Sequence, residues 1–155
     1  MTVEMELYIS TKRQLKKDSW ILLGGQPPSG TDHLPVIEIK QDHENNSGSK
    51  NSFKPDLVAY KENQIRVFEI KPKYSESDEV KLISFLRDER RIASFWAEIE
   101  ARSITKQIDE LNNVANIEIQ GALVYRGLPN ALNLLWVHAE TPEGFEVLEP
   151  LTLSG

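Results

Sequence analysis

The chain of 155 residues contains no cysteine, so it can form neither a disulfide bond nor a thiolate metal site. It also lacks a long apolar run, and the residues after Met1, TVEMELYISTK, are typical of neither a signal peptide nor a membrane span. A basic surplus is missing as well, because 24 acidic residues outnumber 18 basic ones and give a net charge of −6. Proteins that bind nucleic acids usually carry a basic surplus, so only local clustering of positive charge would permit that function here. We expect a cytoplasmic protein without a membrane segment.

The remaining composition is that of an ordinary globular protein, with 39% hydrophobic and 27% charged residues. The length corresponds to about one domain and is sufficient to bury a core. We therefore expect a single domain over residues 1–155. Within it, the polar segment QDHENNSGSKNS at 41–52 is rich in turn-forming residues and predicts a mobile loop.

The N-terminal segment has two interpretations. Strict alternation of apolar residues over 3–9 favours a strand, whereas the following TKRQLKK contains good helix formers and no helix breaker. We favour a helix. It would place Glu4 in the middle of one broad face, with Glu6 pointing away, and that face would also carry Val3, Leu7, Tyr8 and Leu15.

Apolar alternation predicts strands elsewhere in the chain, namely SWILLGG (19–25), LPVIEIK (34–40), DLVAY (56–60), IRVFEIK (65–71), IEIQGALVYRG (117–127) and ALNLLWVHA (131–139). The last two would pair across a turn at 128–130, and the tail at 141–153 would add a short edge strand. Between these groups, 75–113 is helical in pattern and forms either one long helix or two helices with a bend near 88–92. Its apolar stripes are Val80, Ile83 and Leu86, then Ile92, Phe95, Trp96 and Ile99, then Ile104, Ile108 and Leu111. This order of elements predicts an α/β or α+β protein.

Three charged residues interrupt the two strands in the middle of the chain. If the strands are joined by a two-residue turn at 62–63, Asp56 faces Glu69; a turn at 63–64 sets Asp56 opposite Lys71 instead. In both registers Asp56, Glu69 and Lys71 share one face of the sheet, because side chains alternate with a period of two.

Two gathered carboxylates repel each other unless a counter-charge is present. Mg²⁺ prefers such oxygen ligands, and it polarises a phosphodiester and lowers the pKa of a bound water. A neighbouring lysine can orient that water or stabilise charge developing on the phosphate. The patch therefore has the parts for metal-assisted phosphodiester hydrolysis.

These residues resemble the signature of the PD-(D/E)XK nuclease superfamily, with Pro55-Asp56, twelve intervening residues and then Glu69-Ile70-Lys71. The resemblance implies an α/β fold with a mixed central β-sheet flanked by helices, a restriction endonuclease-like core. It also implies that Asp56, Glu69 and Lys71 are catalytic. Asp56, Glu69, the backbone carbonyl of Ile70 and a glutamate of the first helix would bind Mg²⁺ or Mn²⁺. Glu4 is the first candidate for that glutamate and Glu6 the second.

An accidental match is the alternative to this resemblance, because the motif is short. Glu38-Ile39-Lys40 also reads E-x-K, but Asp32 lies only six positions before Glu38, too close for a hairpin. Asp56 and Glu69 could likewise be ordinary charges on an exposed hairpin. Three apolar residues on the same face, Val58, Ile65 and Val67, argue against an exposed face.

Basic and aromatic residues near the motif are candidates for nucleic-acid binding, namely Lys73, Tyr74, Lys81, Arg87 and Arg91. Lysines and arginines here would grip phosphates without reading sequence. The alternative is a solvated helix face on which these charges pair with Glu79, Asp88 and Glu89.

Two functions therefore compete: a metal-dependent nuclease acting on DNA, and a nuclease-like domain without catalysis that serves as a binding or assembly module for nucleic acid or protein. The partners expected for the first are DNA, a second copy of the chain in a homodimer, and a protein that supplies specificity. The small size of the chain is closer to that of a resolvase or an accessory nuclease than to that of a complete restriction enzyme.

Overall fold

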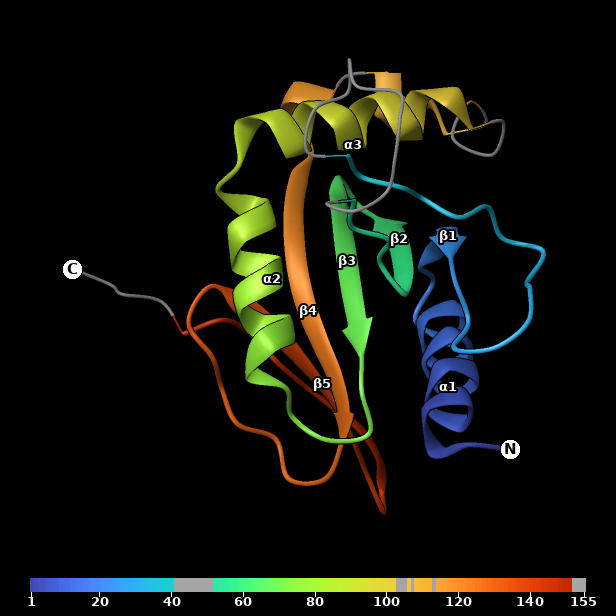
Figure 1. The fold of residues 1–155 in the computed structure, drawn as a ribbon, viewed down its shortest axis with the longest axis vertical. Coiled ribbons are helices and arrows are strands. Elements are labelled where there is room, and N and C mark those ends of the chain that lie inside the picture. The colour runs from blue at the N-terminus through green and yellow to red at the C-terminus, as the bar shows by residue number, and fades with distance from the viewer. Residues whose placement is uncertain (41–51, 103–105, 107, 113, 152–155) are drawn as a thin grey trace.

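The computed structural model describes residues 1–40, 52–102, 106, 108–112 and 114–151. The mobile loop predicted for 41–52 lies outside the described residues, apart from Ser52. A six-stranded sheet runs through the molecule, with helices packed against it (Figure 1). The elements, in chain order, are α1 (Val3–Lys17), β1 (Ile21–Gly25), β2 (Leu57–Lys61), β3 (Gln64–Ile70), α2 (Glu76–Leu86), α3 (Glu89–Ala101), the short 3-10 helices η2 (Asp109–Asn112) and η3 (Val114–Asn116), β4 (Glu118–Arg126), β5 (Leu135–Thr141) and β6 (Gly144–Leu148).

The strands lie in the order β1-β2-β3-β4-β5-β6, and the sheet is mixed. The pairs β1–β2 and β2–β3 are antiparallel, β3–β4 and β4–β5 are parallel, and β5–β6 is antiparallel. A bulge interrupts β1 between Leu22 and Gly24. At Gly24 a Cβ atom would lie 2.4 Å from Cγ1 of Ile37 and 2.9 Å from the carbonyl oxygen of Pro35, so only glycine permits this close approach.

Helix α1 covers one face of the sheet, as the N-terminal pattern predicts. Thr2 caps it by accepting the amide of Met5, and acidic residues in its first turn and lysines in its last complement the helix dipole. The side chains buried between α1 and the sheet are Leu7, Tyr8 and Leu15 from the helix and Leu57, Ala59, Phe68, Ile70, Ala122 and Val124 from the strands.

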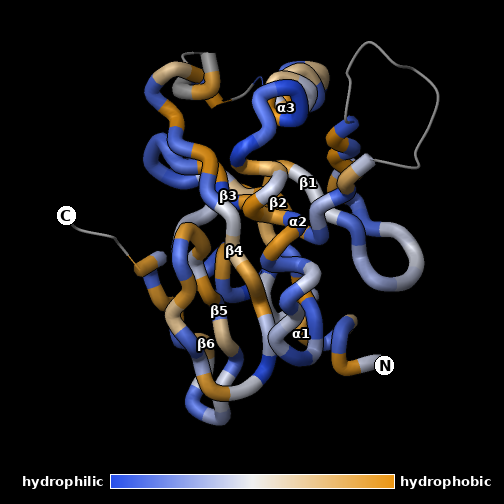
Figure 2. The backbone as a smooth tube through the Cα atoms, turned by 60° about the vertical axis from the view of Figure 1, so that its left-hand side comes forward, coloured by the Kyte–Doolittle hydropathy of each residue, from blue (hydrophilic) through white to orange (hydrophobic). Residues whose placement is uncertain are grey.

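Helices α2 and α3 cover the opposite face. Ser75 caps α2, and Asp88 caps α3 by accepting the amides of Arg90 and Arg91, so the predicted helical region is two helices rather than one. Figure 2 shows hydrophobic segments gathered on the strands in the middle of the molecule, with more hydrophilic segments in the outer loops. The buried residues on this face include Val58, Tyr60, Ile65, Val67, Leu82, Phe85, Phe95, Ile99, Leu123 and Val137.

The apolar stripe predicted for α2 is confirmed in part, because Ile83 and Leu86 are partly buried against the core. Val80 is 56% exposed, whereas Asp78, Leu82 and Phe85 are buried. The stripe predicted for α3 is confirmed, since Phe95 and Ile99 are buried and their partners are partly so. In the third stripe Ile108 and Leu111 are buried but belong to a segment with 3-10 rather than α-helical structure, and Ile104 lies outside the described residues.

Two strand predictions also need correction. Among the described residues, 34–40 makes a single isolated bridge, between Ile39 and Phe53, and one bond from the amide of Gly25 to the carbonyl of Pro35. Leu34, Ile37 and Ile39 are buried because this extended segment packs on the core, whereas Val36 is 39% exposed. In addition, β4 and β5 are parallel rather than joined as a hairpin, because the connection 127–134 runs back along the sheet before β5 begins.

The α/β class, with a mixed sheet between helices, is confirmed. In the part of the chain that the structure describes, no helix combines the length and apolar character that crossing a membrane requires.

Candidate active site

The β2–β3 hairpin sets the position of the two acids. Its turn residues Glu62 and Asn63 have φ angles of 47° and 63°, the left-handed backbone of a type I′ turn. Lys61 consequently pairs with Gln64, which is the first of the two predicted registers. Continued to the other end of the hairpin, this register brings Asp56 opposite Glu69.

Backbone hydrogen bonds fix Asp56 between two strands. Its amide donates to the carbonyl of Phe68 at 3.0 Å, and its carbonyl accepts the amide of Gln26 at 3.0 Å. Its side chain continues the ladder, because Oδ2 accepts the amide of Ile70 at 2.7 Å. One carboxylate oxygen is thus committed to the backbone, and the carboxyl group is held rigidly at the end of the hairpin.

Glu69 is 4% exposed and lies beside Asp56 closely enough for their carboxyl groups to share a hydrogen bond. Burial and the neighbouring charge of Asp56 raise the pKa of Glu69 to about 8. Burial also raises the pKa of Asp56. The pair therefore favours a shared proton or an added positive charge, and such a pair of carboxyl groups is more typical of a functional site than of a core.

A lysine from α2 supplies one positive charge. Nζ of Lys81 donates to Oε1 of Glu69 at 2.8 Å and lies 3.8 Å from Oδ1 of Asp78. Asp78 is buried, and its Oδ2 has no hydrogen-bond partner among the described residues. The sequence places Lys81 among possible phosphate contacts but does not indicate its contact with Glu69. The missed signal is that α2 begins six residues after Ile70, so its first turns must cover the end of β3.

Lys71 lies at the same end of the sheet but does not reach Glu69. Its Nζ is 3.8 Å from Oε1 of Glu4, and its side chain is 47% exposed. Its charge lowers the pKa of Asp56, whereas the charge of Glu4 raises it, so both groups act on the pair electrostatically. Glu6, the second candidate in the first helix, is directed instead to Arg126, with Oε2 3.6 Å from Nη2.

The other predicted nucleic-acid contacts fall into two groups. Lys73 and Tyr74 follow the site directly and are exposed, although the hydroxyl of Tyr74 donates to Oε2 of Glu79 at 2.9 Å. Arg87 is the C-cap of α2, and Arg91 lies in the first turn of α3. Arg91 is 3.4 Å from Asp88, and Arg87 lines a hollow beside the first residues of β3 and β4. These two arginines are therefore not brought to the carboxyl pair.

This end of the sheet carries the carboxyl pair, a backbone carbonyl and two lysines. Among the residues that the structure describes, no group of three or more His, Cys, Asp or Glu side chains is close enough to hold a metal ion. The predicted four-ligand set is therefore not assembled, because Glu4 faces Lys71 and a ligand from the first helix would need to move.

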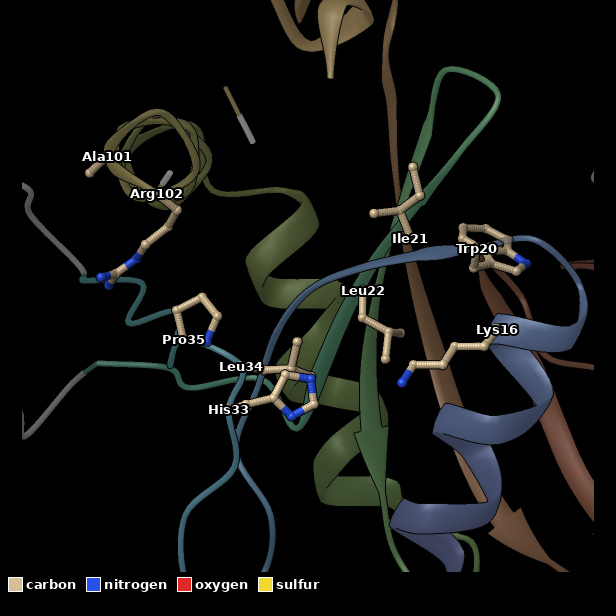
Figure 3. Close-up of a pocket in the computed structure, with 9 residues that line it drawn as sticks. All are labelled: Lys16, Trp20, Ile21, Leu22, His33, Leu34, Pro35, Ala101 and Arg102. Atoms are coloured by element: carbon tan, nitrogen blue, oxygen red, sulfur yellow. The ribbon is translucent and has the colours of Figure 1, made fainter. Parts of the chain in front are cut away.

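A separate hollow of about 760 Å³ lies between the end of α1, β1 and the end of α3 (Figure 3). It contains none of the predicted catalytic residues. The view shows Lys16 at the end of α1, Trp20 directly before β1, His33 to Pro35 from the connection after β1, and Ala101 and Arg102 at the end of α3. Arg102 donates to the carbonyl of Val36 at 2.9 Å and to Glu98 at 2.7 Å, so its guanidinium fastens α3 to the connection after β1.

No protein-family model matches the chain, and no curated protein matches it either. Function is therefore inferred from the residues of this chain and their geometry.

Proposed function

We propose that the chain is a metal-dependent nuclease of the PD-(D/E)XK class that hydrolyses phosphodiester bonds in DNA. The observation that carries this proposal is the carboxyl pair of the partly buried Asp56 and the buried Glu69, with Lys71 two residues further on. A hairpin with ordinary surface charges would leave both acids in water. Here Glu69 is 4% exposed, and burial raises the pKa of its carboxyl group. The apolar residues on its face are fully buried.

The arrangement of elements supports the same proposal. A first helix, a strand that ends in Gly24 and Gly25, the Pro55-Asp56 pair, the strand with Glu69 and Lys71, and a following helix occur in the order that the restriction endonuclease-like core implies. The sheet is mixed and has helices on both faces, as that core also implies.

The donor set fits a hard cation. Carboxylate oxygens of Asp56 and Glu69, with the backbone carbonyl of Ile70, are the ligands that Mg²⁺ or Mn²⁺ prefers, and Mg²⁺ retains several waters beside one or two carboxylates. Glu4, which acts electrostatically on Asp56, would be a further ligand if it left Lys71. When bound, such a cation polarises the phosphodiester and lowers the pKa of a bound water.

The lysines of the chain would act on the phosphate. Lys71 is half exposed at the rim of the carboxyl pair, so its ammonium group is available to stabilise negative charge on the phosphate as the bond to the leaving oxygen breaks. Lys81 holds Glu69 through the 2.8 Å hydrogen bond and keeps a second ammonium group beside the pair. Lys81 is thus a positioning residue for Glu69.

One observation favours the second candidate, a nuclease-like binding module without catalysis. Lys81 already neutralises Glu69, and Lys71 already faces Glu4. A binding module needs no cation at the carboxyl pair, and the net charge of −6 fits a protein partner better than DNA.

A cleavage assay separates the two. The protein is incubated with plasmid, linear duplex, single-stranded and four-way-junction DNA in Mg²⁺, in Mn²⁺ and in EDTA. Asp56→Asn, Glu69→Gln and Lys71→Met should lower cutting by about a hundredfold or more, the typical range for removal of a catalytic group. Glu4→Gln is compared with Glu6→Gln, which makes the same charge change two residues away on the same helix. If Glu4 serves the site, only the first lowers cutting.

Binding of Mn²⁺, followed by calorimetry, completes the test. Metal binding that disappears in Asp56→Asn, together with metal-dependent cutting, supports the nuclease. Metal binding without cutting of any of these DNAs supports the inactive module. If the wild type neither binds metal nor cuts, the nuclease proposal is wrong, whereas the binding module, which needs no cation at the carboxyl pair, is not contradicted.

A further inference from the structure

Arg66 on β3 is a cation buried inside the protein, on the face of β3 opposite Glu69. It is 4% exposed, and aromatic rings surround its guanidinium group. The guanidinium carbon lies 3.6 Å from the ring centre of Trp136 and 4.7 Å from that of Trp20. Burial lowers its pKa to about 10, so the group remains charged at neutral pH.

The hydrogen bonds of Arg66 have only one possible direction, because a guanidinium group donates and never accepts. Nη1 lies 3.0 Å from Nε2 of His138, so this imidazole nitrogen must accept and the ring is neutral. Nε donates to Oε1 of Gln120 at 2.9 Å. The amide of Gln120 is therefore oriented by the arginine rather than free to rotate.

The orientation of Gln120 in turn fixes the hydrogen-bond direction at a third side chain, Gln64. With its oxygen turned to Arg66, Gln120 offers its amide nitrogen, which donates to Oε1 of Gln64 at 2.9 Å. The oxygen of Gln64 is thereby committed as an acceptor, and its own amide nitrogen is the donor that ends the chain. A buried charge thus orients and polarises one terminal N–H donor group.

This chain ends at a hollow of about 1120 Å³. Gln64, Gln120 and Trp136 all line it, together with Asn133 and Arg87. It lies at the first residues of β3 and β4, whereas Glu69 lies five residues further along β3, about 16 Å away at ~3.3 Å per residue. The hollow and the carboxyl pair are therefore two separate sites.

The charges of the hollow decide what it can hold. Glu118 and Glu149 line it with Arg87, and the buried Arg66 also acts on both glutamates, so the hollow has no positive surplus that would favour a phosphate group. An oriented amide donor favours a neutral carbonyl acceptor, and Trp136 adds an aromatic surface for a flat ligand. A pyrimidine base carries carbonyl acceptors on a flat ring.

We propose that this hollow binds one unpaired pyrimidine base, whose carbonyl oxygen accepts a hydrogen bond from the amide of Gln64 while the ring contacts Trp136. The base comes from a single strand of nucleic acid or from a free nucleoside, which share this chemistry. The site does not depend on the carboxyl pair or on a metal ion. A result that refutes this proposal therefore leaves the nuclease proposal intact, and the reverse is also true.

The test is a binding titration in EDTA, which excludes metal-dependent cutting. The probes are a short oligothymidylate, an abasic strand of the same length and free thymidine. Binding is followed by the anisotropy of labelled strands and by quenching of tryptophan fluorescence. Oligothymidylate should bind about tenfold or more tightly than the abasic strand, because stacking of a base on an aromatic side chain is typically worth such a factor. Quenching by thymidine would identify free nucleosides as ligands, and quenching only by the strand would identify single strands.

Three variants test the residues. Gln64→Glu keeps the acceptor for Gln120 but removes the donor, so affinity for oligothymidylate should fall about tenfold or more. Trp136→Phe should also weaken binding and should reduce the quenching. Glu118→Gln removes a negative charge beside the same site and should change affinity less than about threefold if the base is the ligand. Circular dichroism and urea unfolding verify that each variant is folded.

Equal affinity for the abasic strand would overturn the proposal, as would a folded Gln64→Glu variant that binds like the wild type. A large gain in affinity for the abasic strand in Glu118→Gln would also overturn it, because the hollow would then be recognising phosphate.

Discussion

His138 provides a pH-dependent contribution to stability that can be isolated by one substitution. The side chain is 4% exposed on β5, accepts a hydrogen bond from Arg66 and packs edge-on against Phe68 with the ring centres 5.1 Å apart. Burial, with the charge of Arg66 as a second cause, lowers the pKa of His138 from 6.5 to about 3. The folded protein therefore keeps this ring neutral over a pH range in which the unfolded chain protonates it.

The sign and size of this pH-dependent contribution to stability follow from the difference in bound protons between the folded and unfolded states. Between pH 6.5 and pH 3 the unfolded state binds a proton that the folded state does not, so stability falls as the pH falls. The slope approaches about 1.4 kcal/mol per pH unit once the unfolded histidine is fully protonated, so the loss between about pH 6.5 and pH 4.5 is about 2 kcal/mol. Well above pH 6.5 the ring is neutral in both states and contributes no slope.

The assay is urea unfolding at a series of pH values, followed by tryptophan fluorescence. His138→Gln keeps an acceptor for Arg66 but cannot titrate, so its stability should fall by about 2 kcal/mol less than that of the wild type between about pH 6.5 and pH 4.5. Contributions from other titrating groups, including the opposite slope from Glu69, cancel in this comparison. His33→Gln, which removes an imidazole that is 70% exposed and lies 2.7 Å from Asp32, is the control for the loss of a histidine. Identical slopes for wild type and His138→Gln would show that His138 is not held neutral in the folded protein.

Substitutions at three further positions test the local structure around the sites. Asp32→Asn should lower stability by about 1 to 3 kcal/mol at neutral pH, because the carboxylate accepts from Lys12 and from the hydroxyl of Tyr8. Since these bonds outweigh burial and lower the pKa of Asp32, urea unfolding should show the deficit shrinking as the pH falls below 3.8. Gly25→Ala would put a Cβ atom 2.7 Å from the hydroxyl oxygen of Tyr8, so we expect a loss of about 1 to 3 kcal/mol in thermal unfolding, and wild-type stability would refute this packing. Asn63 has a φ of 63°, so Asn63→Gly should be tolerated whereas Asn63→Val should cost about 1 to 2 kcal/mol, and equal unfolding midpoints would refute the type I′ turn.

The carboxyl pair could be predicted from sequence because everything that determines it is local. A period of two places Asp56 and Glu69 on one face, and the short turn between the strands restricts the register to two choices. The turn residues then select one of them, since both adopt the left-handed backbone that a type I′ turn requires. Burial of that face was equally predictable, because Val58 and Val67 alternate with the acids.

The contact between Lys81 and Glu69 could not be predicted in the same way, because it depends on how α2 is rotated on the sheet. The apolar positions of α2 are ambiguous, and counting Val80 as a core residue turns Lys81 away from the sheet. In the structure Leu82 and Phe85 face the core, which brings Asp78 and Lys81 over the end of β3. A rotation of one residue on a helix is about 100°, and it is settled by packing against the strands rather than by the helix sequence.

Strand β3 carries a buried acid on one face and a buried arginine on the other, and neither choice favours folding. Glu69 is raised in pKa by burial, and the guanidinium group of Arg66 is desolvated between aromatic rings. Exchanging buried charged groups for well-packed apolar residues is often neutral or stabilising, so a strand that served stability alone would be apolar at both positions. The stability sacrificed at each position is therefore best explained by a ligand. Under the two proposals made above, this ligand is a cation with its phosphodiester at Glu69 and a carbonyl group that meets the oriented amide of Gln64 at Arg66.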